Sequence, residues 1–419
     1  MRRSIVKRFL ILSCLIVPAI FSQAAFAANW VGGSGGDLWN VAANWSTGIV
    51  PTAVDTVYIY APPYQGPIID STVSAVGKQI DGPGNSVGEN LMQMTGGTLT
   101  LTNNWRVNTA YGQGPGKVKI SGGTITTGGY LFVGYRGTGV LTMTDGVLNI
   151  GADIDTGRDR QSETVCGDGT LNLEGGTITV GTKMRVGNHG KAVLNMSGGS
   201  LTVSQYLRIG DVNTGIGVAN ISGGTLTVNA SVGEGLRVGN SGTGTLNITG
   251  GTINVGGDAI IGNAAGSHGQ VIMNNGVVNA TTYLTVGNQG NGSFIMNGGT
   301  VNLVQYLQVG GVGTPQGTGY FELNGGTILL GRPDTVDLLI NDNSTMNIAG
   351  GTMIIRGNAV SYVEALILGN RLVGYNGDGW INLEYVEQEA QTIVTGIPEP
   401  ATIALLTLGG LVLLRKKSA

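Results

Sequence analysis

The stretch Leu236–Gly262 (LRVGNSGTGTLNITGGTINVGGDAIIG) contains a unit that recurs along most of the chain. A short strand-like piece ends in Val-Gly-Asn, and a Gly/Ser/Thr turn follows it. A second alternating piece (TLNI) then runs into paired glycines, and a third (TINV) leads to the next copy. Three short strands and three turns therefore fill one unit.

The residue after the paired glycines marks each copy of the unit. It falls at Thr98, Thr124, Val147, Thr177, Ser200, Thr225, Thr252, Val277, Thr300, Thr327 and Thr352, with steps that average about 25 residues. A fixed period of roughly 20–50 residues indicates a solenoid, propeller or array, and a four-stranded propeller blade needs about 40. We therefore predict an all-β fold, a single-stranded parallel β-helix of about 11 coils, with a repeat body at residues 92–370.

Alternation inside each piece predicts which side chains point inward. In Thr225-Leu226-Thr227-Val228, a period of two places Leu226 and Val228 on one face and the threonines on the other. Stacked coils would join these apolar residues into one column. The 75 glycines fit tight turns that require positive φ. A hydrophobic share of 41% at strand spacing argues against disorder.

The first 27 residues have the pattern of a secretory signal peptide. A basic start precedes the apolar run 9–21, and Ala25-Phe26-Ala27 fits a small-x-small cleavage site. We expect cleavage between Ala27 and Ala28 by a signal peptidase. Because a secretory signal peptide directs a chain to export, we expect this protein to be exported.

Residues 28–91 form a tryptophan-rich block followed by irregular first coils. Trp30, Trp39 and Trp45 stand within sixteen residues, followed by Pro51 and Asp55. This block is similar to the N-terminal opening of autotransporter-like, β-helical exported proteins. The structural interpretation is an aromatic cap over the end of the apolar column. The alternative is a platform on which sugars stack.

The C-terminal region departs from the repeat. Residues 371–396 are expected to form a terminal strand and a linker. In 397–419, Pro398-Glu399-Pro400 precedes the apolar segment 401–414, and Arg415-Lys416-Lys417 follows. This arrangement resembles the PEP-CTERM sorting signal of exported bacterial proteins. The resemblance implies transient insertion in the inner membrane, processing by an exosortase, and delivery to the cell surface or medium, often beside exopolysaccharide.

Composition argues against two classes of function. Charged residues make up 11% of the chain and the net charge is −3, so no nucleic-acid partner is expected. His189 and His268 lie at least three coils apart and cannot share a metal ion. We expect no metal site and no cofactor.

Parallel β-helices also support polysaccharide lyases and hydrolases, which require clustered carboxylates. The most charged stretch of the repeat body is Asp153–Glu163 (DIDTGRDRQSE), which lengthens one step and is expected to form a loop. Its Asp153, Asp155 and Asp159 are the weak catalytic candidates of an enzyme alternative.

Outward ladders are the other candidate sites. Arg106, Arg185, Arg208 and Arg237 precede Val/Ile-Gly in their coils, with Tyr206 and other tyrosines two residues before that position. Candidates for binding an acidic glycan are therefore Arg185, Arg208, Arg237 and Tyr206, together with the three tryptophans. A further ladder just past the Gly is expected to be structural and comprises Asn188, Asn240, Asn263, Asn288 and Asp211.

A Thr-x-Thr row, exemplified by Thr225 and Thr227, resembles the surface of ice-binding solenoids. It is interrupted by Val147, Val277 and Asn254, which makes ice binding a minor alternative. The expected function is that of an exported, non-catalytic structural or adhesion solenoid of the cell surface or extracellular matrix, associated with exopolysaccharide.

Overall fold

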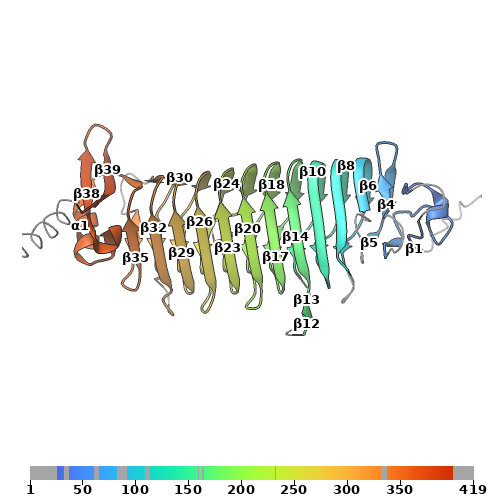
Figure 1. Ribbon diagram of the computed structural model, residues 1–419, viewed down its shortest axis with the longest axis horizontal. Coiled ribbons are helices and arrows are strands. Elements are labelled where there is room, and N and C mark those ends of the chain that lie inside the picture. Colours follow the sequence, from blue (N-terminus) through green and yellow to red (C-terminus); the bar gives the residue numbers. More distant parts are fainter. Residues whose placement is uncertain are drawn as a thin grey trace, which may run out of the picture.

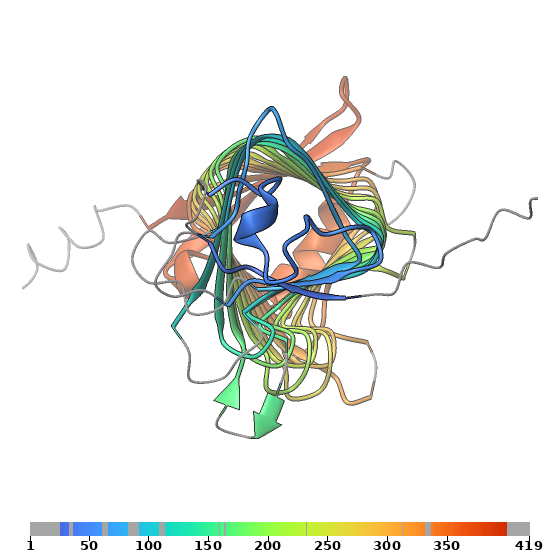
Figure 2. The same ribbon diagram turned by 90° about the vertical axis from the view of Figure 1, so that its right-hand side faces the viewer.

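The computed structural model describes residues 26–32, 37–60, 66–82, 92–108, 114–158, 160–162, 165–231, 233–312, 314–331 and 337–399. These residues form an elongated rod of stacked coils (Figure 1), and the view along the rod shows the coils superposed around one interior (Figure 2). The predicted parallel β-solenoid is confirmed. The signal-peptide core, Asp159, Pro400 and the basic end lie outside the described residues.

Each coil contributes one strand to each of three faces, and neighbouring coils pair in parallel. We number the faces in the order in which the chain of one coil passes through them, as in β23, β24 and β25. The third face is a sheet of thirteen strands: β1 (Ala27–Asn29), β2 (Thr56–Tyr58), β5 (Gln79–Asp81), β7 (Trp105–Val107), β9 (Leu131–Val133), β11 (Ile154–Thr156), β16 (Lys183–Val186), β19 (Tyr206–Ile209), β22 (Gly235–Val238), β25 (Asp258–Ile261), β28 (Leu284–Val286), β31 (Leu307–Val309) and β34 (Leu338–Ile340).

The first face carries the longer strands: β3 (Ile68–Ile69), β14 (Asp168–Leu173), β17 (Lys191–Met196), β20 (Ile216–Ile221), β23 (Thr243–Ile248), β26 (His268–Met273), β29 (Asn291–Met296), β32 (Thr318–Leu323) and β35 (Thr345–Ile348). The second face holds β4 (Ser74–Gly77), β15 (Thr177–Val180), β18 (Ser200–Val203), β21 (Thr225–Val228), β24 (Thr252–Val255), β27 (Val277–Ala280), β30 (Thr300–Leu303), β33 (Thr327–Leu330) and β36 (Thr352–Arg356). Three strands run through both faces: β6 (Met92–Leu101), β8 (Gly116–Thr127) and β10 (Thr138–Ile150).

The alternation of apolar and polar residues predicted from the sequence determines which side chains pack in the interior. Leu226 and Val228 are fully buried, while Thr225 and Thr227 remain partly exposed. Leu226 pairs in register with Leu201 below it and Ile253 above it, so like residues stack into a continuous apolar column. Because a one-residue slip would turn this column outward, the burial pattern fixes the register.

Glycines hold the corner between the third and first faces. Gly239 directly follows β22 and has φ +69, a backbone conformation that residues with a Cβ rarely adopt. Gly244, in the following strand, lies directly against it. A Cβ on Gly244 would overlap the Gly239 nitrogen and the Ile209 carbonyl oxygen, so only glycine allows this close approach.

One interior position is underfilled. Ala259 stacks between Leu236 and Leu284, and these three residues line a small apolar void together with Ile253 and Phe294. We expect Ala259→Val to raise the free energy of unfolding by about 0.5–1 kcal/mol, the lower range for filling a cavity. Urea unfolding checks this, and a loss of stability would show that the void is too narrow for two extra methyl groups.

The tryptophan-rich block caps the N-terminal end of the column, as one of its two interpretations predicts. Trp39 is 0% exposed, and Trp45 packs against it edge-to-face with a centroid distance of 4.8 Å. Trp45 Nε1 donates to the Trp39 carbonyl oxygen at 2.7 Å. The short helix η1 (Ala42–Asn44) carries the chain between these rings. The ring faces of Trp39 and Trp45 are thereby occupied by the protein itself.

The C-terminal end differs from the prediction. After β36 the regular repeat ends. Helix α1 (Val360–Leu368) follows and buries Val363 and Leu366 in the core, and residues 372–374 add one more parallel strand beside β35. The chain then forms β37 (Leu372–Gly374), the short helix η2 (Tyr375–Gly377), β38 (Gly379–Val386) and β39 (Gln391–Pro398). β38 and β39 make an antiparallel hairpin that projects beyond the coil outline (Figure 2), where a single strand and linker were expected.

The expected insertion loop also begins later than predicted. Asp153–Gly157 is not a loop, because Ile154 points inward and is fully buried in β11 of the third face. The additional residues form a projecting antiparallel hairpin of β12 (Arg160–Ser162) and β13 (Val165–Cys166) (Figure 1). No helix in the described part of the chain is long and apolar enough to cross a membrane.

Candidate functional site on the third face

The arginine ladder predicted from the sequence exists, and its members lie in register on the third face. Arg185 pairs with Arg208, and Arg208 with Arg237. The structure adds a member that the sequence analysis missed. Asp155 pairs with Arg185 on one side and with Phe132 on the other. A carboxylate therefore occupies the arginine position of its coil.

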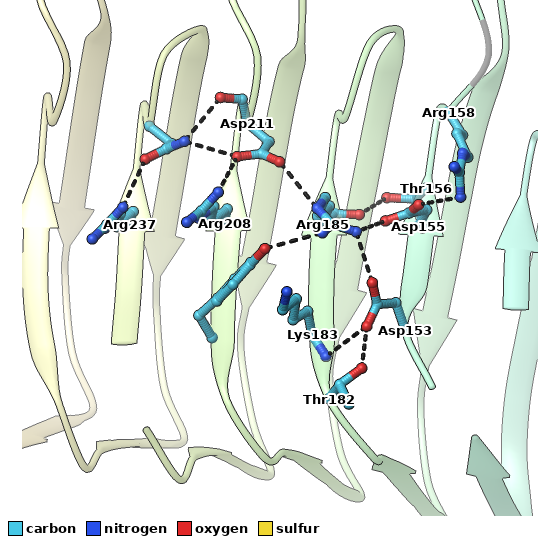
Figure 3. A network of polar contacts seen from close by, with 12 residues as sticks. Asp153, Asp155, Thr156, Arg158, Thr182, Lys183, Arg185, Arg208, Asp211 and Arg237 are labelled. Carbon is cyan, nitrogen blue, oxygen red and sulfur yellow. Dashed lines mark hydrogen bonds and ion pairs between the residues drawn. The ribbon is translucent and has the colours of Figure 1, made fainter. Parts of the chain in front are cut away.

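Arg185 is the centre of an ion-pair network across three coils (Figure 3). Its Nη1 lies 2.7 Å from Asp155 Oδ1 and 3.0 Å from Asp153 Oδ2, and its Nε lies 3.1 Å from Asp211 Oδ2. Its Nη2 donates to the Tyr206 hydroxyl at 3.0 Å. All three guanidinium nitrogens thus have partners in the protein.

Burial makes this network energetically important. Asp155 is 1% exposed and Asp153 is 7% exposed. Burial raises the pKa of Asp155 above the ordinary carboxyl value, although the charge of Arg185 acts in the opposite direction. Burial acts to lower the pKa of Arg185, but the neighbouring Asp155 carboxylate outweighs it and the pKa is raised. Arg158 Nη1 contacts the second oxygen of Asp155 at 2.9 Å.

The network continues toward the next two coils. Arg208 Nη1 contacts Asp211 Oδ1 at 3.2 Å. The Cζ of the same guanidinium lies over the Tyr206 ring, 3.9 Å from its centroid. Arg237 donates from Nη1 to Asn240 Oδ1 at 3.3 Å. Burial and the charge of Arg208 lower the pKa of Arg237. Tyr206 is buried between these groups, so its ring is not open to a sugar.

This arrangement can hold coils together, but it offers no free catalytic carboxylate. A general acid or nucleophile must contact a substrate, whereas Asp153 and Asp155 direct their oxygens at Arg185 and at the Thr182 hydroxyl. The signal for this was present in the sequence. Asp153-Ile154-Asp155-Thr156-Gly157 aligns with Tyr206-Leu207-Arg208-Ile209-Gly210 through its aliphatic second residue and its final glycine, which places Asp155 at the position of the arginine.

A similar carboxylate stands further along the third face. Asp258 is buried and accepts hydrogen bonds from Tyr283 Oη at 2.5 Å and from Thr282 Oγ1 at 3.0 Å. Burial and this bond to Asp258 raise the pKa of the Tyr283 hydroxyl. Tyr283 stacks on Tyr306 with a centroid distance of 4.9 Å. These contacts also link one coil to the next.

The asparagine ladder is confirmed as hydrogen-bonded. Asn263 donates to Asn240 at 2.9 Å, and Asn240 donates to Asp211 at 2.8 Å. A second row on the first face repeats the pattern, with donor–acceptor distances of 2.8 Å at each of three steps: Asn195 to Asn172, Asn220 to Asn195 and Asn247 to Asn220. Stacked amides therefore connect successive coils outside the core.

We expect Asn220→Ala to lower the free energy of unfolding by about 1–2 kcal/mol, because it removes two amide hydrogen bonds in the middle of this row. Asn324→Ala is the matched control, since Asn324 is exposed and its amide donates one bond, to Asn297. Urea unfolding of both variants checks the comparison. If both variants lost the same free energy of unfolding, the two hydrogen bonds of Asn220 would not stabilise the fold more than the single bond of Asn324.

The threonine row lies in register on the second face, with Thr225 beside Thr252 and Thr227 beside Asn254. Asn254, which interrupts the Thr-x-Thr pattern in the sequence, therefore also interrupts the row of threonines on the second face. Within the described residues, no group of three or more His, Cys, Asp and Glu side chains is arranged to hold a metal ion.

Comparison with known proteins gives no relative from which a role could be transferred. No family model, no curated protein and no solved structure matches the chain. The features that indicate a function are therefore the solenoid, its surface contacts and the two chain ends.

Proposed function

We propose that this protein is an exported, non-catalytic β-solenoid that serves as a structural or adhesive component of the cell surface or extracellular matrix. The observation that carries the proposal is the state of Asp153 and Asp155, which are buried in ion pairs with Arg185. The described carboxylates of the enzyme alternative therefore stabilise coil stacking, as side chains of a scaffold do.

Two further features support a scaffold. Both ends of the apolar column are covered by the chain itself, by the tryptophan block at one end and by α1 at the other. The sequence of the tail, from Pro398 onward, supports export and sorting by an exosortase-type enzyme, with the cell surface or medium as the destination.

Location is tested by expressing the full chain in an exopolysaccharide-producing bacterium, with and without residues 398–419. We expect to find the full chain in the surface or medium fraction. We expect the truncated chain, which lacks the sorting tail, to be distributed differently between the cell fractions and the medium. Cytoplasmic retention of the full chain would contradict export.

The catalytic alternative is tested by incubating the protein with acidic and neutral polysaccharides and measuring both co-sedimentation and new sugar ends. We expect no new ends. Release of ends that is abolished by Asp159→Asn, in a variant that unfolds at the same temperature as the wild type, would establish an enzyme and overturn the proposal.

A further inference from the structure

The hairpin of β38 and β39 at the C-terminal end carries two exposed apolar side chains that lie opposite each other. Trp380 is 51% exposed and Ile397 is 43% exposed, and the two residues pair in register across the hairpin. Ile381 and Leu383, on the alternate face of β38, pack against the core. Trp380 therefore lies on the outward face of the hairpin.

Trp380 differs in this respect from every other tryptophan of the chain. All five tryptophans lie within the described residues, and Trp30, Trp39, Trp45 and Trp105 are each 5% exposed or less. Three of them form the N-terminal cap and the fourth lies in β7, so all four are near the opposite end of the rod. An indole ring combines a large apolar body with one polar N–H, which suits a boundary between an apolar and a wet phase.

The chain leaves the fold beside this ring. Trp380 pairs with Ile397, which lies two residues before Glu399, the last described residue. In the sequence, the apolar segment 401–414 begins four residues after Ile397. Four residues span at most about 14 Å, and paired residues of antiparallel strands lie about 5 Å apart. Trp380 is therefore held within about 20 Å of the start of the apolar segment.

Charged residues are distributed unevenly around this end of the chain. Glu387 and Glu389 lie in the turn of the hairpin, at the end away from Ile397. Residues 372–414 contain no Lys or Arg, whereas Arg415-Lys416-Lys417 follows the apolar segment directly. Because basic residues concentrate on the cytoplasmic side of a membrane segment, this asymmetry places the hairpin on the opposite side.

We propose that the hairpin end formed by Trp380 and Ile397 contacts the headgroup boundary of the bilayer while segment 401–414 is inserted. Tryptophan rings are enriched at this depth of a membrane. Asp378 and Glu399, the carboxylates at this end, are exposed and stay hydrated among the headgroups. The acidic turn, about 20 Å away along the strand, stays in water. The inference rests on the proposed sorting of the tail and adds a membrane contact made by the folded domain.

The test measures quenching of tryptophan fluorescence by brominated phosphatidylcholine. The chain is produced with its own signal peptide in a bacterium without an exosortase, purified from the membrane with its tail intact, and reconstituted in phosphatidylcholine vesicles. We expect part of the emission to be quenched, and more strongly by bromines near the headgroup than by bromines near the end of the acyl chains. Trp380→Phe is expected to abolish this quenching, because the remaining tryptophans are buried.

A relocated tryptophan is the matched control. In the double variant Trp380→Phe/Tyr385→Trp, the ring moves five residues along the same strand. Tyr385 is 37% exposed and pairs with Thr392, close to the turn. We expect the emission of this variant to be quenched by neither lipid. Equal quenching at positions 380 and 385 would show that the hairpin lies flat on the bilayer, which overturns a contact confined to the tail-side end.

The contribution of the contact to membrane binding is tested with Trp380→Ser. Vesicle partition of this variant is expected to fall about tenfold, because roughly half of an indole side chain no longer leaves water. Ile216→Ser is the control, since Ile216 is 43% exposed and lies in β20 in the middle of the rod. We expect the control to partition as the wild type does. Variants are compared at equal thermal stability, and equal losses in both would overturn the inference.

Failure of the inference is distinguishable from failure of the proposed function. If vesicles retain the chain but quench the wild type no more than Trp380→Phe, the membrane contact is wrong and the export proposal stands. If vesicles do not retain the chain, both the contact and the tail as a membrane segment are wrong. The matrix role fails separately, if the chain is not exported or releases sugar ends.

Discussion

Replacing Gly244 by alanine is expected to lower the free energy of unfolding by at least about 3 kcal/mol, the upper end for overpacking a rigid interior. The added Cβ would overlap backbone atoms of Gly239 and Ile209, which belong to two different coils. Neither atom is the end of a flexible side chain, so relief requires the coils to separate. The measurement is the urea midpoint of the variant, together with its yield of folded protein.

Gly266→Ala is the matched control for this substitution. Gly266 has φ +77, but a Cβ there would meet no atom within 4 Å. The expected loss of unfolding free energy is therefore that of placing an alanine in the left-handed backbone conformation, about 1–2 kcal/mol. If the two variants lost equal stability, close approach of coils would not be the reason for glycine at position 244.

Replacing Arg185 by methionine is expected to cost about 3–5 kcal/mol, the range for removing one partner of a buried ion pair. The loss arises because Asp153, Asp155 and Asp211 would keep buried negative charge without their common cation. Arg356→Met is the control, because Arg356 is exposed and its guanidinium donates to a backbone carbonyl oxygen, that of Gly331, at 3.4 Å. Thermal unfolding at neutral pH checks the difference.

The stability lost in Arg185→Met is expected to depend on pH, because Arg185 affects the protonation of Asp155. The pKa of Asp155 is already above the ordinary carboxyl value, so the folded state binds more protons than the unfolded state between these two pKa values. Stability therefore falls as pH rises through that window. Without Arg185 the pKa rises further and the window widens.

We therefore expect the deficit of Arg185→Met relative to the wild type to shrink as the pH is lowered from about 7 toward 4. The double variant with Asp155→Asn is expected to recover part of the loss at neutral pH, because it removes one of the buried charges that Arg185 no longer neutralises. A deficit that is independent of pH would show that packing, and not charge, is the main contribution of Arg185.

The fold was predictable because a solenoid is assembled from neighbours. Each coil contacts the coils before and after it, so a repeat of about 25 residues encodes strand, turn and stacking partner at once. The alternation at Leu226 and Val228 and the asparagine ladder on the third face followed from the same period. The arginine positions followed as well, since Arg185, Arg208 and Arg237 share one place in the motif.

The charged site was only half predictable. The lengthened step in the repeat predicted a loop at Asp155, and it concealed that the coil continues through Thr156. Stacking placed this carboxylate against Arg185, thirty residues later, and converted candidate ligand-binding groups into structural ion pairs. The sorting and signal motifs remain predictions of the sequence.

The solenoid, its inward column and its side-chain ladders could be predicted from the sequence, since they depend on local periodicity and on contacts between adjacent repeats. The pairing of Asp155 with Arg185, and the closure of the last coil by α1 and the β38–β39 hairpin, became visible in the folded chain. The physical reason is that these features depend on which side chains meet across coils and on aperiodic segments, where no repeat fixes the partner.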